Sequence, residues 1–337
     1  MPTRRQRLLD LLAMGRVANV PTVLCNVFTG CLLGAWFWGG LNQDLYPGHK
    51  ISLLLPLLSG ACLYLGGCFL NDWSDSHWDK QHRPERAIPS GRIHPQTVLK
   101  IAAALLAAGL ALAFYARVWA LLPAAAIATA ILIYTRFHKQ TPLAIIPMGL
   151  CRGLLYVLGF FAQALPQPEV IAGLFEKASP LVPVWQDYSR SSLFLLSLSL
   201  GLLAYIAGLS LAARFESKGQ LIGNTKLLAL LLLATPILTH TWIWIEATPK
   251  PSYLAAALFA LVLLPVITLI RKRGLGLFVS ALLAIIPLID LIVLAPISRA
   301  AVAGPLVVPT ISSTTILAVP FLALLLALAL QRLAPAT

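Results

Sequence analysis

Residues 71–92 read NDWSDSHWDKQHRPERAIPSGR and hold four of the twelve acidic residues of the chain, between long apolar runs. If this stretch continues the helix expected before it, Asp72, Asp75 and Asp79 fall at positions i, i+3 and i+7. Asn71 then lies one turn before Asp75, so four oxygen-bearing side chains share one face. Such a face repels itself unless a cation binds there. Carboxylate and amide oxygens suit Mg²⁺, whose remaining positions are commonly filled by substrate phosphates.

Basic residues follow the acidic ones within the same stretch. Arg83, Arg86 and Arg92 suit the charge of a phosphate, because a guanidinium can bind two of its oxygens at once. The alternative is that these acids and bases pair with one another in a solvated loop. An EF-hand calcium loop is excluded, since it alternates acids at every second residue around a glycine.

The composition indicates a polytopic membrane protein. The chain of 337 residues is 59% hydrophobic and 11% charged, with a mean hydropathy of +0.84. This is too apolar for a soluble globular protein. The net charge of +13 is spread over short loops, which is typical of cytoplasmic loops and argues against a nucleic-acid binder. The five cysteines lie inside apolar segments, so we expect neither disulfides nor a zinc site.

Ten apolar runs approach the roughly 20 residues that a membrane-spanning helix needs. They are residues 17–40, 51–71, 97–115, 118–136, 142–165, 191–213, 225–246, 251–270, 275–296 and 311–331. We expect an all-α bundle of nine, or ten, transmembrane helices around a central cavity, forming a single domain over residues 1–337. Prolines in the last hundred residues leave breaks or re-entrant pieces open.

The charges of the loops predict the orientation of the chain in the membrane. Most Lys and Arg residues lie in connections on the side of the N-terminus, which places that side in the cytoplasm. Residues 1–16 then form a cytoplasmic segment, and residues 166–190, rich in proline, form an extracytoplasmic loop. We expect an integral protein of the bacterial inner membrane, with the acidic stretch at a cytoplasmic mouth.

The acidic stretch resembles a known motif. Asn71-Asp72-x-x-Asp75-x-x-x-Asp79, followed by Arg83-Pro84-x-Arg86 and Pro89-Ser90-Gly91, is similar to the first aspartate-rich motif of the UbiA superfamily of intramembrane prenyltransferases. The resemblance implies an all-helical membrane enzyme with nine spans. It also implies that an isoprenoid diphosphate binds through Mg²⁺ and that its prenyl group passes to an acceptor.

A second connection resembles the same family. Residues 134–141 read YTRFHKQT and are similar to the Tyr…Lys-Arg-x-Thr connection of UbiA enzymes, whose basic pair faces the diphosphate. The resemblance assigns substrate binding to Tyr134 and Lys139, with His138 as a departure that carries less charge at pH 7. Ordinary positive-inside anchoring is the alternative for Lys139.

The connection after the sixth run departs from the family pattern. Residues 211–219 read LAARFESKG, where UbiA enzymes carry two or more aspartates that hold a second Mg²⁺. Glu216 is the single candidate ligand there, and Arg214 and Lys218 could bind the diphosphate directly in place of a metal. The alternative is a helix-end pairing of these three side chains. A branch of UbiA-like proteins encoded in ebo-type bacterial gene clusters looks similar in this respect.

Polar residues inside apolar runs are costly and tend to line cavities. Asn26 resembles the first-helix asparagine of UbiA enzymes that faces the cavity, with a structural hydrogen bond between helices as the alternative. Arg152 is expected to line the cavity and to meet an acid or a phosphate, and Asp290 is expected to be buried. His240 and Glu246, beside Trp242 and Trp244, are interpreted as residues of the membrane interface.

These features predict a Mg²⁺-dependent prenyltransferase. Asn71, Asp72, Asp75 and Asp79 would hold the metal, and the basic residues would neutralise the departing diphosphate. The acceptor is an unidentified small molecule or lipid, and membrane lipids are the surrounding partners. The alternative is a non-catalytic UbiA-like protein that binds or translocates a lipid or metabolite precursor, which the reduced second motif would favour.

Overall fold

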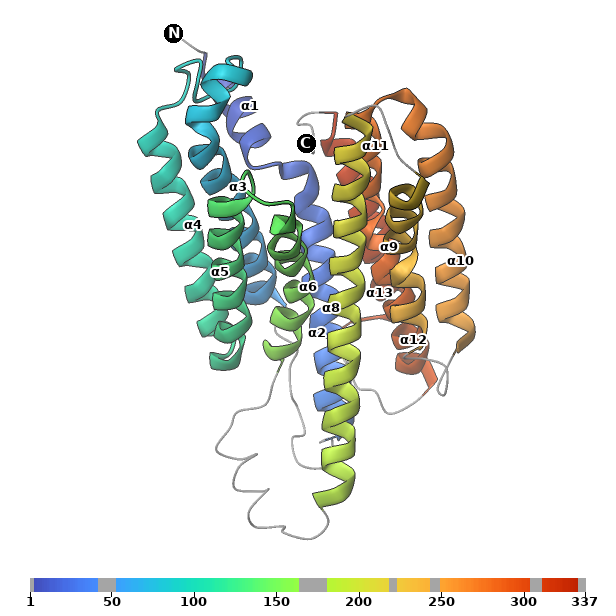
Figure 1. Ribbon diagram of the computed structural model, residues 1–337. Helices are drawn as coiled ribbons and strands as arrows, with labels where there is room; N and C mark the ends of the chain where they lie inside the picture. The colour runs from blue at the N-terminus through green and yellow to red at the C-terminus, as the bar shows by residue number, and fades with distance from the viewer. Residues whose placement is uncertain are drawn as a thin grey trace.

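Helices make up all the regular secondary structure of the residues that the computed structural model describes, which are 3–41, 53–163, 181–217, 223–242, 249–303 and 311–332. The α-helices are α1 (Arg4–Met14), α2 (Val20–Leu41), α3 (Leu54–His82), α4 (Pro95–Ala116), α5 (Leu121–Phe137), α6 (Ile145–Phe161), α8 (Leu181–Ser217), α9 (Gly223–Thr241), α10 (Pro249–Pro265), α11 (Leu275–Ala284), α12 (Ile286–Ala303) and α13 (Ser313–Leu330). Most of them run side by side (Figure 1), which confirms the all-α prediction.

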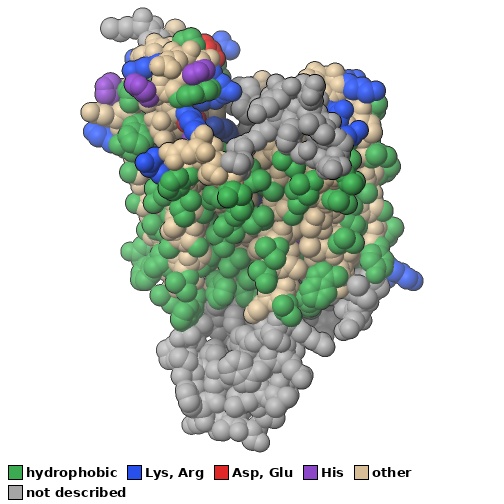
Figure 2. Space-filling model, in the orientation of Figure 1, with side chains coloured by type: hydrophobic (Ala, Val, Ile, Leu, Met, Phe, Trp, Pro, Cys, Tyr) green, Lys and Arg blue, Asp and Glu red, His purple; other side chains and the backbone are tan. Residues whose placement is uncertain are grey.

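The bundle is built to lie in a membrane. In the described part of the chain, eight helical segments are long and apolar enough to cross a bilayer, and two shorter apolar helices cover Ile145–Phe161 and Lys226–Thr241. These segments coincide with the ten apolar runs of the sequence. Hydrophobic side chains surround the middle of the face shown in Figure 2, while charged side chains gather mainly at the end that holds α1. The chain is therefore an integral membrane protein.

One of the expected spans is broken. The run predicted over 275–296 forms two helices, α11 and α12, which meet at the turn residue Ile285. Pro287 lies in the first turn of α12, where backbone N–H groups have no partner within the helix. Its missing N–H therefore costs no helical hydrogen bond. The break places the C-terminal part of α11 against the cavity described below.

The proline-rich connection is more helical than predicted. The sequence favoured a loop over 166–190, but residues 181–190 belong to α8, so the prediction is wrong there. Pro183 lies in the first turn of α8, where a proline is tolerated. At 37 residues, α8 is about 55 Å long by helix geometry, longer than a bilayer core of about 30 Å. Its first turns extend below the other helices in Figure 1, and residues 166–180 lie outside the described part.

Two large apolar cores fill most of the bundle, with α6 contributing to both, and a smaller cluster joins α2, α12 and α13. One core joins α2–α6 and contains Leu63, Ile127 and Leu158. The other joins α6 to α8–α12 and contains Tyr205 and Phe259. The seam between these two halves is where the main cavity opens.

Two glycines bring α2 and α6 into direct backbone contact. Gly30 on α2 faces the backbone of Tyr156, and Gly159 on α6 faces the backbone of Val27. A methyl group at either glycine would overlap a carbonyl oxygen of the partner helix. Small residues permit such close approach in membrane bundles, and this contact positions the polar side chains that α2 and α6 share.

We predict that Gly30→Ala destabilises the bundle by about 1–3 kcal/mol, the usual range for overpacking. The measurement is unfolding of the purified protein in detergent, followed by tryptophan fluorescence. Gly276→Ala is the matched control, because nothing lies within 4 Å of a Cβ built at this helical glycine. Equal unfolding curves for the two variants would contradict the close packing of α2 on α6.

Candidate functional site

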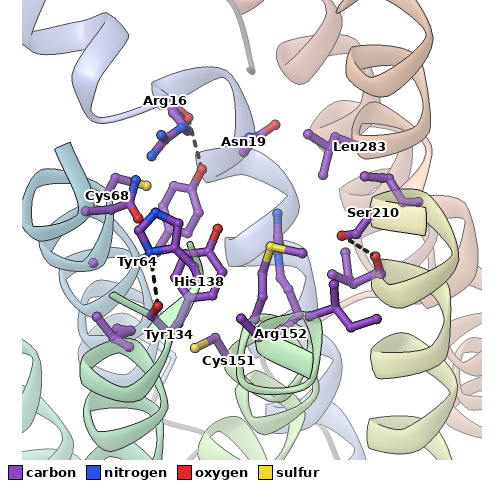
Figure 3. Close-up of a pocket in the computed structure, with 18 of the residues that line it drawn as sticks. Arg16, Asn19, Tyr64, Cys68, Tyr134, His138, Cys151, Arg152, Ser210 and Leu283 are labelled. Atoms are coloured by element: carbon purple, nitrogen blue, oxygen red, sulfur yellow. Dashed lines mark hydrogen bonds between the residues drawn. The ribbon is translucent and has the colours of Figure 1, made fainter. Parts of the chain in front are cut away.

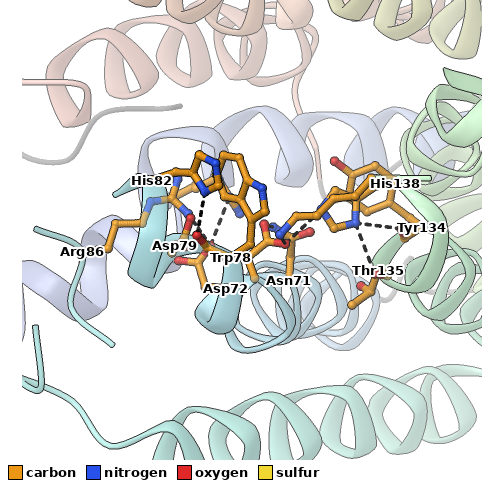
Figure 4. Close-up of polar contacts among 12 residues, drawn as sticks. Asn71, Asp72, Trp78, Asp79, His82, Arg86, Tyr134, Thr135 and His138 are labelled. Atoms are coloured by element: carbon orange, nitrogen blue, oxygen red, sulfur yellow. Dashed lines mark hydrogen bonds and ion pairs between the residues drawn. The ribbon is translucent and has the colours of Figure 1, made fainter. Parts of the chain in front are cut away.

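The acidic motif lies on the last turns of α3, which continues without a break to His82. The motif therefore continues the preceding helix, as the sequence analysis supposed. The side chains, however, divide into two groups, each with its own basic partners (Figure 4). Asn71 and Asp75 face the end of α5, whereas Asp72 and Asp79 face Arg16 and Arg86.

The first group is held by the connection after α5. Asn71 Nδ2 donates to Asp75 Oδ2 at 3.3 Å, and His138 Nε2 lies 3.1 Å from Asp75 Oδ1. Lys139 Nζ pairs with the same oxygen and also lies over the Trp78 ring. The hydrogen bond with Asp75 raises the pKa of His138 above its usual value, so the imidazolium is stabilised beside this carboxylate.

The second group is bridged by arginines. Arg86 Nη1 lies 2.9 Å from Asp79 Oδ2 and 3.8 Å from Asp72 Oδ1. Arg16 Nη2 reaches Asp72 Oδ1 at 3.2 Å from the other side. The Asp79 side chain is only 3% exposed. The acids and bases thus pair, as the alternative interpretation foresaw, but inside the protein rather than in a solvated loop.

Asn71 and Asp75 offer oxygen atoms that a magnesium ion could use. Within the described residues, no group of three or more His, Cys, Asp or Glu side chains is close enough to share a metal. Mg²⁺ commonly needs only one or two carboxylates when substrate phosphates supply the other oxygens. Asn71 is buried, and its Oδ1 has no hydrogen-bond partner in the described part of the structure. This hard oxygen beside Asp75 fits a divalent cation.

The site opens on a cavity of about 520 Å³ between the two halves of the bundle (Figure 3). One part of its lining is polar and basic: Arg16, Asn71, Arg83, Arg86, Tyr134 and His138. Another part is apolar: Ile127, Ile131, Leu155, Ile206 and Leu209. A second cavity of about 230 Å³ lies beside it and is lined by Asp72 and Asp79. Arg16 and Arg86 line both, so the two cavities share a basic wall.

A salt bridge fixes the loop that follows the motif. Arg92 donates to both oxygens of Asp10 on α1, at 2.7 and 3.1 Å, and to the carbonyl of Glu85 at 2.9 Å. The hydrogen bond to Asp10 raises the pKa of Arg92. Arg92 therefore holds α1 and the loop together, and it lines the second cavity but not the larger one.

Two predicted residues lie deeper in the bundle. Arg152 lines the cavity, as expected. Asn26 is fully buried and bonds to Arg152 and Asp290, so it reaches the cavity through Arg152. The structural hydrogen bond between helices, which was the alternative for Asn26, is the contact seen. Asp290 is fully buried, as expected.

Sequence reasoning missed Arg16. It has a positive φ of 44°, unique among the non-glycine residues described, at the turn between α1 and the first span. This costly backbone conformation aims its guanidinium at Asp72. A basic residue immediately before the first apolar run was the available signal.

Some predicted positions lie outside what the structure describes, and one is corrected. The side chains of Arg214 and Glu216, and all of Lys218, are outside the described residues. The C-terminal end of α8 lies at the same end of the bundle as α1 (Figure 1), and Ser210 lines the cavity.

His240 is fully buried against Tyr156, so its assignment to the membrane interface is wrong. Glu246 is not described.

Comparisons with known proteins agree with this architecture. The model of the UbiA prenyltransferase family matches residues 27–276. Digeranylgeranylglyceryl phosphate synthase of Ignicoccus hospitalis is 35% identical over 86 residues, 26% of each chain. The chloroplastic chlorophyll synthase of Oryza sativa subsp. japonica is 41% identical over 91 residues, 27% of this chain and 24% of that protein. The matches thus span about a quarter of these relatives.

A solved structure shows the same fold. The apo structure of a UbiA homolog from Aeropyrum pernix K1 has a TM-score of 0.59 at 17% identity. The alignment covers 81% of this chain and 96% of that one.

We predict that Asp79→Asn destabilises the metal-free protein by about 1–3 kcal/mol, because it leaves Arg86 without its closest partner. Thermal unfolding in the presence of a chelator measures the change. Glu85→Gln removes one negative charge from an exposed position of the same loop and is expected to change stability by less than about 0.5 kcal/mol. An Asp79→Asn variant as stable as Glu85→Gln would show that the ion pair is not formed.

Proposed function

This chain belongs to the UbiA prenyltransferase family, and we propose that it is a Mg²⁺-dependent enzyme that transfers a prenyl group from an isoprenoid diphosphate to an acceptor. The observation that supports this most directly is the juxtaposition of the acidic face of α3 with Arg16, Arg83 and Arg86. Asn71 and the three arginines line a large cavity with apolar walls, and Asp72 and Asp79 line the smaller cavity beside it. A diphosphate with a hydrocarbon tail has the same division of charge and apolar surface.

Asp72, Asp75, Asp79 and Asn71 are the residues that would hold the metal. Bound Mg²⁺ would neutralise the charge that develops on the departing diphosphate. Asp75 and Asn71 supply neighbouring oxygens, and Asp72 and Asp79 each lie about one turn from Asp75 along the same helix. Arg16 and Arg86 are paired with Asp72 and Asp79 in the structure. Once a metal binds these carboxylates, the two arginines would be able to pair with the phosphate oxygens of the substrate.

The reaction breaks the C1–O bond of the prenyl diphosphate, and both electrons leave with the diphosphate. Arg16, Arg83, Arg86 and His138 line the cavity where this charge develops, and the arginines can stabilise it. The apolar walls exclude water from the allylic cation that remains. A nucleophilic atom of the acceptor then forms the new bond to C1 and loses a proton.

The connection after α8 supplies a second group in this proposal. Arg214 and Lys218 would bind the diphosphate directly, with Glu216 as the available metal ligand. Support comes from the position of the end of α8 beside the cavity. Tyr134, which lines the cavity, and Lys139, which pairs with Asp75, would complete the substrate contacts.

Acceptor and membrane orientation are also proposals. The names of two relatives, digeranylgeranylglyceryl phosphate synthase and chlorophyll synthase, suggest a lipid or small-molecule acceptor here. We place the cavity mouth and α1 in the cytoplasm, in a bacterial inner membrane, because basic side chains gather at that end (Figure 2).

A second candidate function is a carrier that binds a prenylated lipid or metabolite precursor without turnover. The observation that favours it is the single acid, Glu216, in residues 211–219. A carrier has less need of the acidic face of α3, which is complete.

We predict that the purified protein releases pyrophosphate from farnesyl or geranylgeranyl diphosphate in a Mg²⁺-dependent manner. Asp72→Ala and Asp75→Ala should each lower the rate by about 10²-fold or more, the loss typical of one stabilising group. Radiolabelled substrate and a pyrophosphate assay provide the measurement. Glu85→Gln, which alters an exposed acid of the adjoining loop, should retain the rate.

The carrier hypothesis makes the opposite prediction for the same experiment. Labelled prenyl diphosphate would then bind to the protein without release of pyrophosphate, whether or not Mg²⁺ is present. That result, obtained with a folded protein and a panel of acceptors, would exclude the prenyltransferase proposal.

A further inference from the structure

An apolar groove lies on the outer surface of the bundle, away from the acidic motif. It has a volume of about 500 Å³ and runs between α10, α12 and α13. Its walls include large exposed side chains, such as Leu254 at 73% and Phe321 at 42% exposure. Its floor includes the small residues Ala255, Ala295 and Ser298. Among the described residues, none lines both this groove and the main cavity.

The floor of the groove is suited to hydrocarbon. The hydroxyl of Ser298, which is buried, donates to the Ala295 carbonyl of the same helix at 2.8 Å. No buried side chain among the described residues of the lining has an unsatisfied hydrogen-bonding atom. A polar ligand would therefore lose its hydrogen bonds to water and gain none at the floor. A hydrocarbon chain meets no such penalty.

The groove has about the depth of one membrane leaflet. Its lining runs from Leu291 to Arg299 on α12 and from Ser313 to Phe321 on α13. Eight residues of α-helix cover about 12 Å, and one leaflet contributes about 15 Å to a hydrocarbon core of about 30 Å. Figure 1 shows α12 toward the end of the bundle opposite α1, with the C-terminus back near the α1 end. The groove therefore lies in the leaflet opposite α1.

Positive charge marks the outer end of the groove. Arg299 is exposed and is the single charged residue among the described residues of the lining. None of the ion pairs found in the described part of the chain includes it. Lys250, which is also exposed, directly precedes the lining residue Pro251. Basic side chains at the membrane surface attract anionic lipid headgroups, and a guanidinium can bind two phosphate oxygens at once.

A second copy of the chain fits the groove less well than a lipid does. A two-fold dimer brings the same patch of both subunits together. Two hollow surfaces would then face each other and leave space unfilled, and the two copies of Arg299 would repel each other. A phospholipid supplies both an acyl chain for the apolar floor and a phosphate for the arginine.

We propose that this groove binds one phospholipid with an anionic headgroup, taken from the leaflet opposite α1. An acyl chain lies along α12 between α10 and α13, and the headgroup phosphate binds Arg299. A zwitterionic phospholipid carries the same phosphate together with a cation, which Arg299 and Lys250 repel. The site therefore selects anionic over zwitterionic lipids. It does not depend on the proposed transferase function, because the groove is separate from the main cavity.

Native mass spectrometry of the full chain, delipidated in detergent, tests the inference. The probes are phosphatidylglycerol and phosphatidylcholine with identical palmitoyl and oleoyl chains, so that a difference in binding reports the headgroup alone. We expect the Kd of the first bound phosphatidylglycerol to be about fivefold lower than that of the first phosphatidylcholine, the size expected for one basic residue at an anionic headgroup. Glycerol phosphate, which lacks acyl chains, should not displace the bound lipid.

Arginine variants assign the headgroup preference to a residue. Arg299→Gln should reduce the preference for phosphatidylglycerol to about twofold or less, and its exposed position makes the variant unlikely to disturb folding. Arg117→Gln is the matched control. Arg117 follows the last residue of α4, at the same end of the bundle but outside the groove, so its loss should leave the preference unchanged.

Alanine variants test whether the acyl chain occupies the groove. Ala295→Phe fills the floor and should weaken the binding of the first lipid of either kind at least threefold. Ala104→Phe adds the same ring to an exposed position of α4, where it fills no groove, and should leave both affinities unchanged.

Four results would overturn the inference. Equal affinities of the unaltered chain for the two lipids would exclude selection of an anionic headgroup. Equal effects of Arg299→Gln and Arg117→Gln would show that the preference is spread over the surface. Displacement by glycerol phosphate would indicate a soluble anion as the ligand, and a dimer mass that Ala295→Phe abolishes would identify a second copy of the chain as the occupant.

Discussion

Pairing of carboxylates with cations at the end of α3 is the interaction on which the site depends. Asp72, Asp75 and Asp79 lie at one end of an apolar bundle, where unpaired negative charge is costly. Arg16, Arg86, His138 and Lys139 supply the compensating charge from three separate parts of the chain. In the proposed function these groups serve a metal and a diphosphate, because a divalent cation can replace the bases beside the carboxylates and a polyanion can replace the carboxylates beside the bases. The acidic and basic halves of the site thus stabilise each other until substrate arrives.

Helix packing also positions a second set of polar side chains inside the bundle. Gly30 and Gly159 let α2 and α6 touch, and their contact aligns Asn26 with Arg152 and with Asp290 on α12. Three helices are joined by one polar network at a depth where water is scarce. Such a network holds the cavity wall in one arrangement, since its buried polar side chains hydrogen-bond to one another across the helices. The cavity therefore carries a fixed charge at Arg152 in addition to the charges at its mouth.

Periodicity and hydropathy were sufficient for most of the fold. Long apolar runs predicted the ten helical segments, because burial in lipid demands continuous apolar helices. The motif was expected to continue the preceding helix, which it does, and to place Asn71, Asp72, Asp75 and Asp79 on one face, whereas these side chains face two different sets of partners. Proline misled the prediction at 181–190, since its effect depends on whether it falls in the first turn. The division of the acids between two sets of bases could not be predicted, because Arg16, Arg86 and His138 meet them through tertiary packing. Arg16 and the burial of His240 were missed for the same reason.

Electron paramagnetic resonance of Mn²⁺, substituted for Mg²⁺, tests the central claim most directly. The account predicts that Mn²⁺ and pyrophosphate bind together to the purified protein, with a ³¹P hyperfine coupling that reports direct coordination of the phosphate. The coupling should disappear when Asn71, Asp72, Asp75 and Asp79 are replaced by alanine together in a protein that still folds. Mn²⁺ that stays free in solution, or a coupling that persists in that variant, would contradict the account.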